Sequence, residues 1–157
     1  MTTKKKSAFV NRTLNLKKIQ YLGLDMDHTL VRYNSFNFEK LTHSVMLKKL
    51  VELKNYPKEV LDLPFDFELA IRGLVIDVKK GNVLKVSRHG NIRVSQHGRQ
   101  KLKFSDQKQL YKSTYIDLRD SNNYLSIDTS FSIAFCALFS QLAELKEGNA
   151  FGEEALV

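Results

Sequence analysis

The fold predicted from the sequence depends on the stretch Tyr21-Leu22-Gly23-Leu24-Asp25-Met26-Asp27-His28-Thr29-Leu30. A short apolar run ends in two aspartates that are separated by one residue. Alternation along a strand places Asp25 and Asp27 on the same side, at the end of a strand predicted over residues 19–25. Ligands of open α/β sheets bind at the carboxyl ends of the strands. The pattern therefore predicts a functional site where this strand ends.

The two aspartates point to a particular chemistry. Carboxylates held this close repel each other unless a cation lies between them or one of them keeps its proton. Their oxygens suit Mg²⁺, and together they provide a nucleophile beside a proton donor. A structural interpretation also stays open from the residues alone. In that interpretation the segment is a strand end followed by an acidic turn, with Thr29 as an ordinary helix N-cap.

The six residues from Asp25 to Leu30, read as DMDHTL, resemble the first motif, DxDxT[LV], of the haloacid dehalogenase-like phosphatases. This resemblance implies an α/β fold with a Rossmann-like core. It implies that Asp25 is the nucleophile and a ligand of Mg²⁺. It also implies that Asp27 is the general acid and base, with its carbonyl on the metal, and that Thr29 helps to hold the motif loop.

A closer resemblance extends beyond this motif. Residues 23–30 are similar to the GFDMDYTL form of the cytosolic purine 5′-nucleotidases that prefer IMP and GMP. Residues 72–77 and 81–86 are similar to that family's RGLVFD…GNLLKVD block, and residues 128–131 match it more loosely. The resemblance implies Mg²⁺-dependent hydrolysis of a purine nucleoside 5′-monophosphate through a phospho-aspartate, with the nucleotide as the partner. It implies that Phe131 stacks on the purine base, whereas its helical spacing with Phe135 and Phe139 favours a core position.

The rest of the chain predicts a basic arm over residues 1–18 and one domain over residues 19–157. This domain is the N-terminal part of a haloacid dehalogenase-like fold with an inserted β-meander and helices. An imperfect apolar stripe predicts a helix from Phe38 to about Leu53, with His43 as a partly exposed residue. Three β-branched runs over residues 74–78, 83–87 and 92–95, separated by Gly-Asn turns, predict the meander. Asp128 and Thr129 predict the start of a buried helix over residues 130–145.

Composition places limits on the class of protein. The chain has 157 residues and a formal net charge of +8, which suits an anionic partner. Its single cysteine, Cys136, lies in an apolar run and is expected to be buried and inert. No apolar segment follows the basic start and no run is long enough for a membrane span, so a cytoplasmic protein without a membrane partner is expected.

Two alternatives to an enzyme follow from the same residues. One is a nucleic-acid-binding module built on the basic arm and on Arg99, Lys101 and Lys103, although no recognised binding motif accompanies them. The other is an inactive nucleotide-binding or assembly protein, with homo-oligomerisation as one form of assembly. The superfamily also needs a phosphate-binding Thr or Ser, a Lys and a late acidic pair, none of which is identifiable. The chain is therefore expected to be a fragment, or one piece that needs a partner, with little activity alone.

Overall fold

The fold was analysed in a computed structural model, which describes residues 15–112 and 115–147. The chain divides into two compact units, Met1–Tyr33 and Asn34–Val157. Most of the predicted basic arm, residues 1–14, lies outside the described residues.

The first unit contains the aspartate motif. A short 3₁₀ helix, η1 (Leu16–Lys18), is followed by extended chain up to the motif. The prediction of a β-strand over residues 19–25 is wrong for this structure, because these residues pair with no other strand in the described chain. A strand is stable only where neighbouring backbone groups satisfy its N–H and C=O groups. The side chains of Tyr21 and Leu22 are accordingly 90% and 79% exposed.

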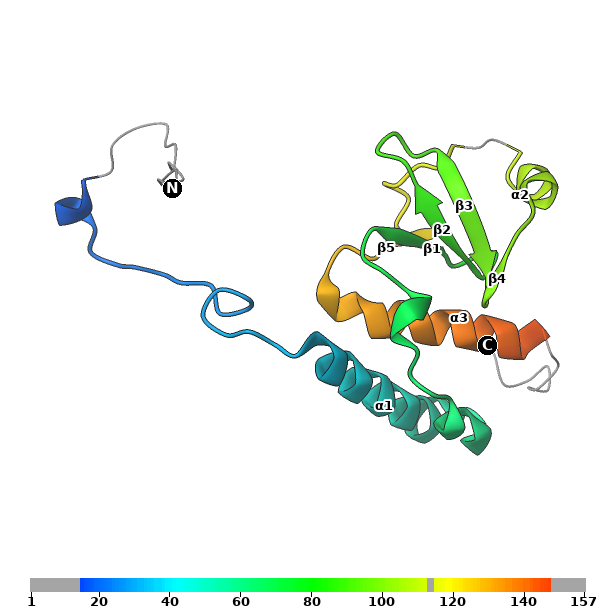
Figure 1. The fold of residues 1–157 in the computed structure, drawn as a ribbon, viewed down its shortest axis with the longest axis horizontal. Coiled ribbons are helices and arrows are strands. Elements are labelled where there is room, and N and C mark those ends of the chain that lie inside the picture. The colour runs from blue at the N-terminus through cyan, green and yellow to red at the C-terminus, as the bar shows by residue number, and fades with distance from the viewer. Residues whose placement is uncertain (1–14, 113–114, 148–157) are drawn as a thin grey trace, which may run out of the picture. The chain divides into compact units, whose positions relative to one another are not determined.

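The second unit is built on an antiparallel sheet in the order β4-β3-β2-β1-β5 (Figure 1). The central strands are β1 (Leu74–Asp77), β2 (Asn82–Val86) and β3 (Ile92–His97), which confirm the predicted meander. The edges are β4 (Gln100–Lys101) and β5 (Tyr124–Ser126), which were not predicted. Both tight turns use glycine at positive φ, with Gly81 at 68° and Gly90 at 78°.

Two long helices lie on one side of this sheet. They are α1 (Ser35–Lys54) and α3 (Ile133–Glu147), and both match predicted helices. Figure 1 shows α3 lying between the sheet and α1. Three 3₁₀ helices, η2 (Lys58–Asp62), η3 (Phe67–Leu69) and η4 (Ser130–Ser132), complete this side. An unpredicted short helix, α2 (Phe104–Leu110), follows β4.

Apolar side chains fill both faces of the sheet. Ile76 and Val83 pack towards α3 with Cys136, whereas Val75 and Leu84 form a second cluster on the other face. This alternation is the period-2 pattern of a strand. Burial raises the pKa of the Cys136 thiol to about 12, which confirms the expectation of an inert thiol.

The start of α3 is capped differently from the prediction. The N-cap residue Thr129 makes no side-chain hydrogen bond to the backbone of η4. Instead the backbone N–H of Ala134 donates a 2.7 Å hydrogen bond to the carboxyl group of Glu39, which is buried on α1. A carboxylate at a helix N-terminus satisfies an otherwise unpaired N–H group and suits the helix dipole.

The prediction that His43 is partly exposed is wrong, since its side chain is buried between the two helices. Its Nε2 atom lies 2.9 Å from Oε1 of Gln141 on α3. The amide nitrogen of Gln141 donates in turn to the carbonyl of Pro64 at 2.7 Å. The helical pattern of α1 alone does not show which face α3 covers.

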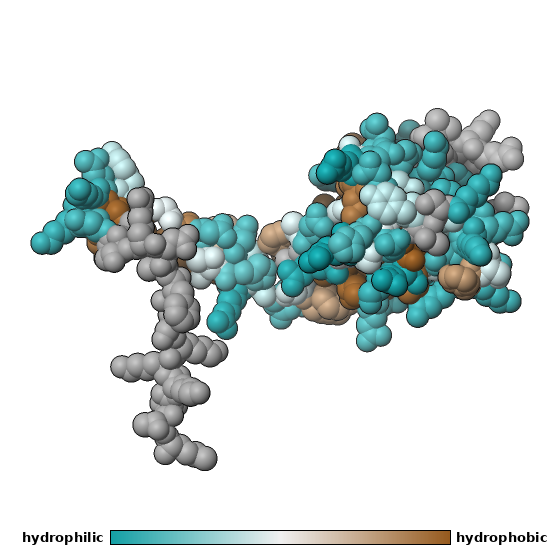
Figure 2. All heavy atoms as spheres, turned by 90° about the horizontal axis from the view of Figure 1, so that it is seen from above, coloured by the Kyte–Doolittle hydropathy of each residue, from teal (hydrophilic) through white to brown (hydrophobic). Residues whose placement is uncertain are grey.

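The face drawn in Figure 2 is mostly hydrophilic, with some apolar side chains between the polar ones. Among the described residues, no helix combines the length and apolar character that crossing a membrane requires. Arg99 of the predicted basic patch lies 3.9 Å from carboxylate oxygens of Asp66 and Glu144, so acidic neighbours offset its charge.

Candidate active site

The aspartate motif forms a tight loop in the first unit. The carbonyl of Met26 accepts hydrogen bonds from the backbone N–H groups of Leu30 at 3.1 Å and Val31 at 3.0 Å. An isolated bridge joins Asp27 to Val31, and His28 adopts a left-handed φ of 58°. These local bonds hold the loop in shape without a sheet. The hydroxyl of Thr29 makes no hydrogen bond to another described residue, and its role in holding the loop stays a prediction.

Asp27 is held more firmly than Asp25. The hydroxyl of Tyr33 donates a 2.6 Å hydrogen bond to Oδ1 of Asp27. This bond raises the pKa of Tyr33, with further effects from desolvation and from the negative charges of Asp27 and Asp25. The ring of His28 lies edge-on to Tyr33 with a centroid distance of 5.5 Å. Asp25 is exposed, so one carboxylate is accessible while the other is oriented.

Phe131, the predicted base-stacking residue, belongs to the second unit. It lies in η4 and is partly buried. Its ring meets Phe38 of α1 edge-on, with a centroid distance of 5.2 Å. This contact joins the beginnings of α1 and α3. The geometry is compatible with both predicted roles, because a partly buried ring keeps some surface open to a ligand.

One protein family is similar to nearly the whole chain. The profile of the 5′ nucleotidase family matches residues 8–155, which is nearly the whole chain. The chain belongs to the 5′-nucleotidase family.

Two curated relatives of the family show similarity over shorter segments. Human 5′-nucleotidase domain-containing protein 1 is 37% identical over 71 residues, which is 45% of this chain and 16% of that protein. A 5′-nucleotidase domain-containing protein of Dictyostelium discoideum is 34% identical over 73 residues, which is 46% of this chain and 12% of that protein. The matched segment thus spans only a small part of either relative.

The aspartate motif provides few ligands for a metal ion. Within the described residues, no group of three or more His, Cys, Asp or Glu side chains converges on one point. Mg²⁺ prefers six oxygen ligands in an octahedron and usually keeps several waters. The resemblance implies the carboxylate of Asp25 and the carbonyl of Asp27 as ligands, and both provide oxygen atoms of the kind that Mg²⁺ binds. Further oxygen atoms from water, substrate or other protein groups would have to complete it.

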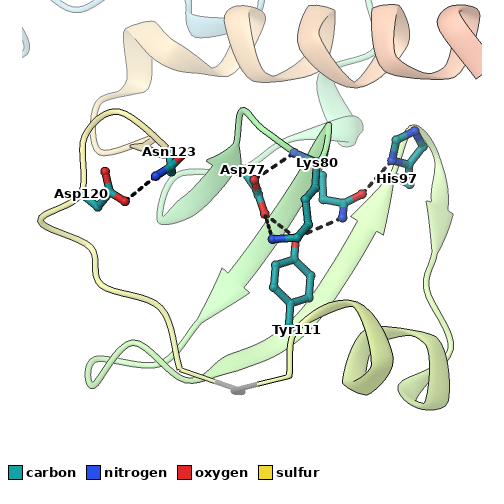
Figure 3. Close-up of polar contacts among 7 residues, drawn as sticks. Asp77, Lys80, His97, Tyr111, Asp120 and Asn123 are labelled. Atoms are coloured by element: carbon teal, nitrogen blue, oxygen red, sulfur yellow. Dashed lines mark hydrogen bonds and ion pairs between the residues drawn. The ribbon is translucent and has the colours of Figure 1, made fainter.

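The second unit contains a polar cluster that the sequence analysis did not predict. Asp77, Asn82 and His97 are direct cross-strand neighbours on β1, β2 and β3. The hydroxyl of Tyr111 donates to Oδ2 of Asp77 at 2.7 Å and accepts from Nδ2 of Asn82 at 3.0 Å. Nδ1 of His97 lies 2.7 Å from Oδ1 of Asn82. Figure 3 shows these contacts at one end of the sheet.

Lys80 also belongs to this cluster, and Tyr111 is buried in it. Nζ of Lys80 lies 3.6 Å from Oδ2 of Asp77 and 4.6 Å from the centre of the Tyr111 ring. Burial raises the pKa of Tyr111 strongly, with a further effect from the charge of Asp77. The only sequence signal for this cluster is an aspartate at the end of an apolar strand, followed by a Gly-Asn turn. That signal did not identify Tyr111, which comes from a segment with no clear periodicity.

Proposed function

We propose that the chain carries the nucleophile and the proton donor of a Mg²⁺-dependent hydrolase of purine nucleoside 5′-monophosphates. The observation that supports this most is the arrangement in the motif loop. Asp25 presents an exposed carboxylate, whereas Asp27 is oriented by the hydroxyl of Tyr33. A nucleophile must reach the substrate, and a proton donor must be aimed at the leaving group.

The proposed reaction has two steps. An oxygen of Asp25 attacks the phosphorus, the bond from phosphorus to the 5′-oxygen breaks, and Asp27 gives its proton to that oxygen. A phospho-aspartate and a free nucleoside result. Water then attacks the phosphorus of the phospho-aspartate while Asp27 takes up a proton, which regenerates Asp25 and releases phosphate. Bound Mg²⁺ would offset the negative charge of the phosphate.

Tyr33 has a positioning role in this scheme. Its hydroxyl donates to Oδ1 of Asp27 and so holds the carboxylate in one orientation, ready to act as a base in the second step. The first step needs Asp27 protonated, and the bond must then be rearranged or weakened when substrate arrives. Phe131 would bind the purine ring. We also propose a cytoplasmic location, because no apolar segment follows the basic start of the sequence.

We infer that efficient turnover needs groups beyond the described residues. The two aspartates lack a third acidic ligand in this part of the chain. The phosphate-binding hydroxyl and the lysine that such an enzyme requires were not identified either. The isolated 157-residue chain should therefore hydrolyse IMP slowly or not at all, and an assembled form should be active.

A single-turnover labelling experiment tests the role of Asp25. IMP carrying a radiolabelled phosphate is mixed with Mg²⁺ and the active form, and the protein is quenched in acid. We expect hydroxylamine-sensitive label in the wild type and none in Asp25→Asn, since no other group forms the intermediate. Asp62→Asn, an exposed aspartate in η2, is the matched control. Label retained in Asp25→Asn would refute the assignment, and rapid IMP hydrolysis by the purified chain would refute the need for further groups.

A further inference from the structure

A cavity of about 740 Å³ lies in the second unit, away from the aspartate motif in the sequence. The turn between β1 and β2, the end of β3 and the last turns of α3 form its walls. Tyr56, Phe139 and Leu142 provide apolar walls. A volume of this size, with apolar walls and a few converging polar groups, is typical of sites for small organic molecules.

The polar groups of the cavity are mostly basic. Lys79, Lys80 and Lys146 line it together with His97, whereas Glu147 is its one acidic lining residue among those described. Lys80 is partly engaged with Asp77, as the 3.6 Å contact shows. The remaining balance is positive, so the cavity attracts a negatively charged ligand.

His97 is held in a defined orientation at this cavity. The Tyr111 hydroxyl donates its one hydrogen to Asp77, so it accepts from Nδ2 of Asn82. Oδ1 of Asn82 consequently faces His97, and Nδ1 of the histidine carries the hydrogen that this 2.7 Å contact needs. The chain of hydrogen bonds thus fixes the tautomer of the ring.

The other ring nitrogen of His97 becomes accessible to a ligand once the exposed side chain of Glu147 turns away from it. Nε2 is buried and makes no hydrogen bond to any described residue. It lies 3.2 Å from Oε1 of Glu147, which is a charge contact only when the ring is protonated. In the neutral ring Nε2 holds a lone pair that faces this carboxylate. A buried nitrogen without a hydrogen-bond partner is unfavourable, and a P–OH group or a proton would satisfy it.

We propose that this cavity binds a small aromatic phosphate monoester. The phosphate contacts Lys146 and Nε2 of His97, and the aromatic ring packs against Tyr56 and Phe139. A monoanionic phosphate donates its P–OH hydrogen to Nε2, and its charged oxygens face the lysine. The site is separate from the aspartate motif and does not depend on the proposed hydrolase function.

Titration of the full chain with phenyl phosphate tests this proposal, with binding followed by the ring-nitrogen NMR signals of His97 and by calorimetry. We expect saturable shifts at His97 with phenyl phosphate and weaker effects with either phenol or inorganic phosphate alone. Equal affinity for phenol would overturn the role of the anion, and equal affinity for inorganic phosphate would overturn the role of the ring. Absence of shifts at His97 would overturn the site.

Two charge variants should change the affinity for phenyl phosphate in opposite directions. Lys146→Gln should weaken binding by about two- to fivefold, and Glu147→Gln should strengthen it by a similar factor, because exposed charges interact at this scale. Lys48→Gln on α1 makes the same charge change outside the cavity and should leave affinity unchanged. Equal effects of Lys48→Gln and Lys146→Gln would mean non-specific attraction and would contradict the proposal.

Two further variants locate the binding. His97→Gln should lower the affinity for phenyl phosphate while the chain keeps its circular dichroism spectrum. Asp25→Asn should bind as the wild type does, because the motif loop takes no part. Loss of binding in Asp25→Asn would place the ligand at the motif and overturn the inference, whatever the outcome of the labelling experiment.

Discussion

The hydroxyl of Tyr111 donates a 2.7 Å hydrogen bond to Oδ2 of Asp77, across 34 residues of sequence. Asp77 ends β1 at the turn to β2, and Tyr111 directly follows α2. Both side chains are nearly inaccessible to solvent, with exposures of 1% and 4%. The bond therefore joins the sheet to the segment that covers its second face.

Tyr111→Phe should destabilise the second unit by about 1–3 kcal/mol. The change leaves the buried carboxylate of Asp77 and the amide of Asn82 each without one hydrogen-bond partner, and burial without a partner costs free energy. Urea denaturation followed by circular dichroism measures the loss. Tyr21→Phe, at a side chain that is 90% exposed, is the matched control and should be neutral. A neutral Tyr111→Phe would show that this bond does not stabilise the fold.

Glu39→Gln should stabilise the chain increasingly as the pH rises. Burial raises the pKa of Glu39, although the hydrogen bond from Ala134 partly opposes this. A raised folded-state pKa gives a stabilising contribution that is complete below the unfolded value of about 4.3 and is lost as the pH rises through the folded value. Glutamine keeps an acceptor for Ala134 and has no charge to bury.

The measurement is urea denaturation of wild type and Glu39→Gln at about pH 4 and pH 7. The stability of the variant relative to wild type should increase between these two values. Glu52→Gln removes an exposed charge from the same helix and should show no comparable pH dependence. A constant difference between Glu39→Gln and wild type at both pH values would contradict the expectation.

Gly90→Ala should be more destabilising than Gly73→Ala. Both glycines have positive φ, 78° and 87°, so each substitution incurs backbone strain of about 1 kcal/mol. At Gly90 an added Cβ would also lie 2.5 Å from the carbonyl oxygen of Ile116, whereas nothing lies within 4 Å at Gly73. Thermal melts compare the two variants. Equal melting temperatures would show that the β2–β3 turn shifts enough to accommodate the added Cβ at little cost in stability.

Phe131→Leu and Phe38→Leu separate packing from nucleotide binding. The two rings form one edge-on contact, so each change should lower the melting temperature by a similar amount. Only Phe131→Leu should raise the KM for IMP in an active form of the protein. If both variants change KM equally, the ring of Phe131 acts through the packing of α1 and α3 and not on the base.

Local sequence patterns were sufficient to predict most of the helices and strands of this fold. The Gly-Asn turns and the β-branched runs predicted the meander, because register and turn chemistry act over a few residues. Helical periodicity predicted α1 and α3, although the starts were displaced by three residues. The DxDxT pattern identified the motif loop, and together with the blocks at residues 72–77 and 81–86 it indicated the 5′-nucleotidase family, because short stretches of neighbouring residues carry these patterns.

Long-range packing decided the features that the sequence did not reveal. The contacts from Glu39 to Ala134 and from His43 to Gln141 span 95 and 98 residues, and each depends on how α3 lies against α1. The polar cluster around Asp77 depends on strand register and on where Tyr111 folds back. The extended chain before Asp25 has a strand-like sequence but no strand partner in the described chain. The sequence by itself thus determined which local elements form, whereas only tertiary structure decided which buried polar groups meet, because that requires surfaces distant in the chain to pack together.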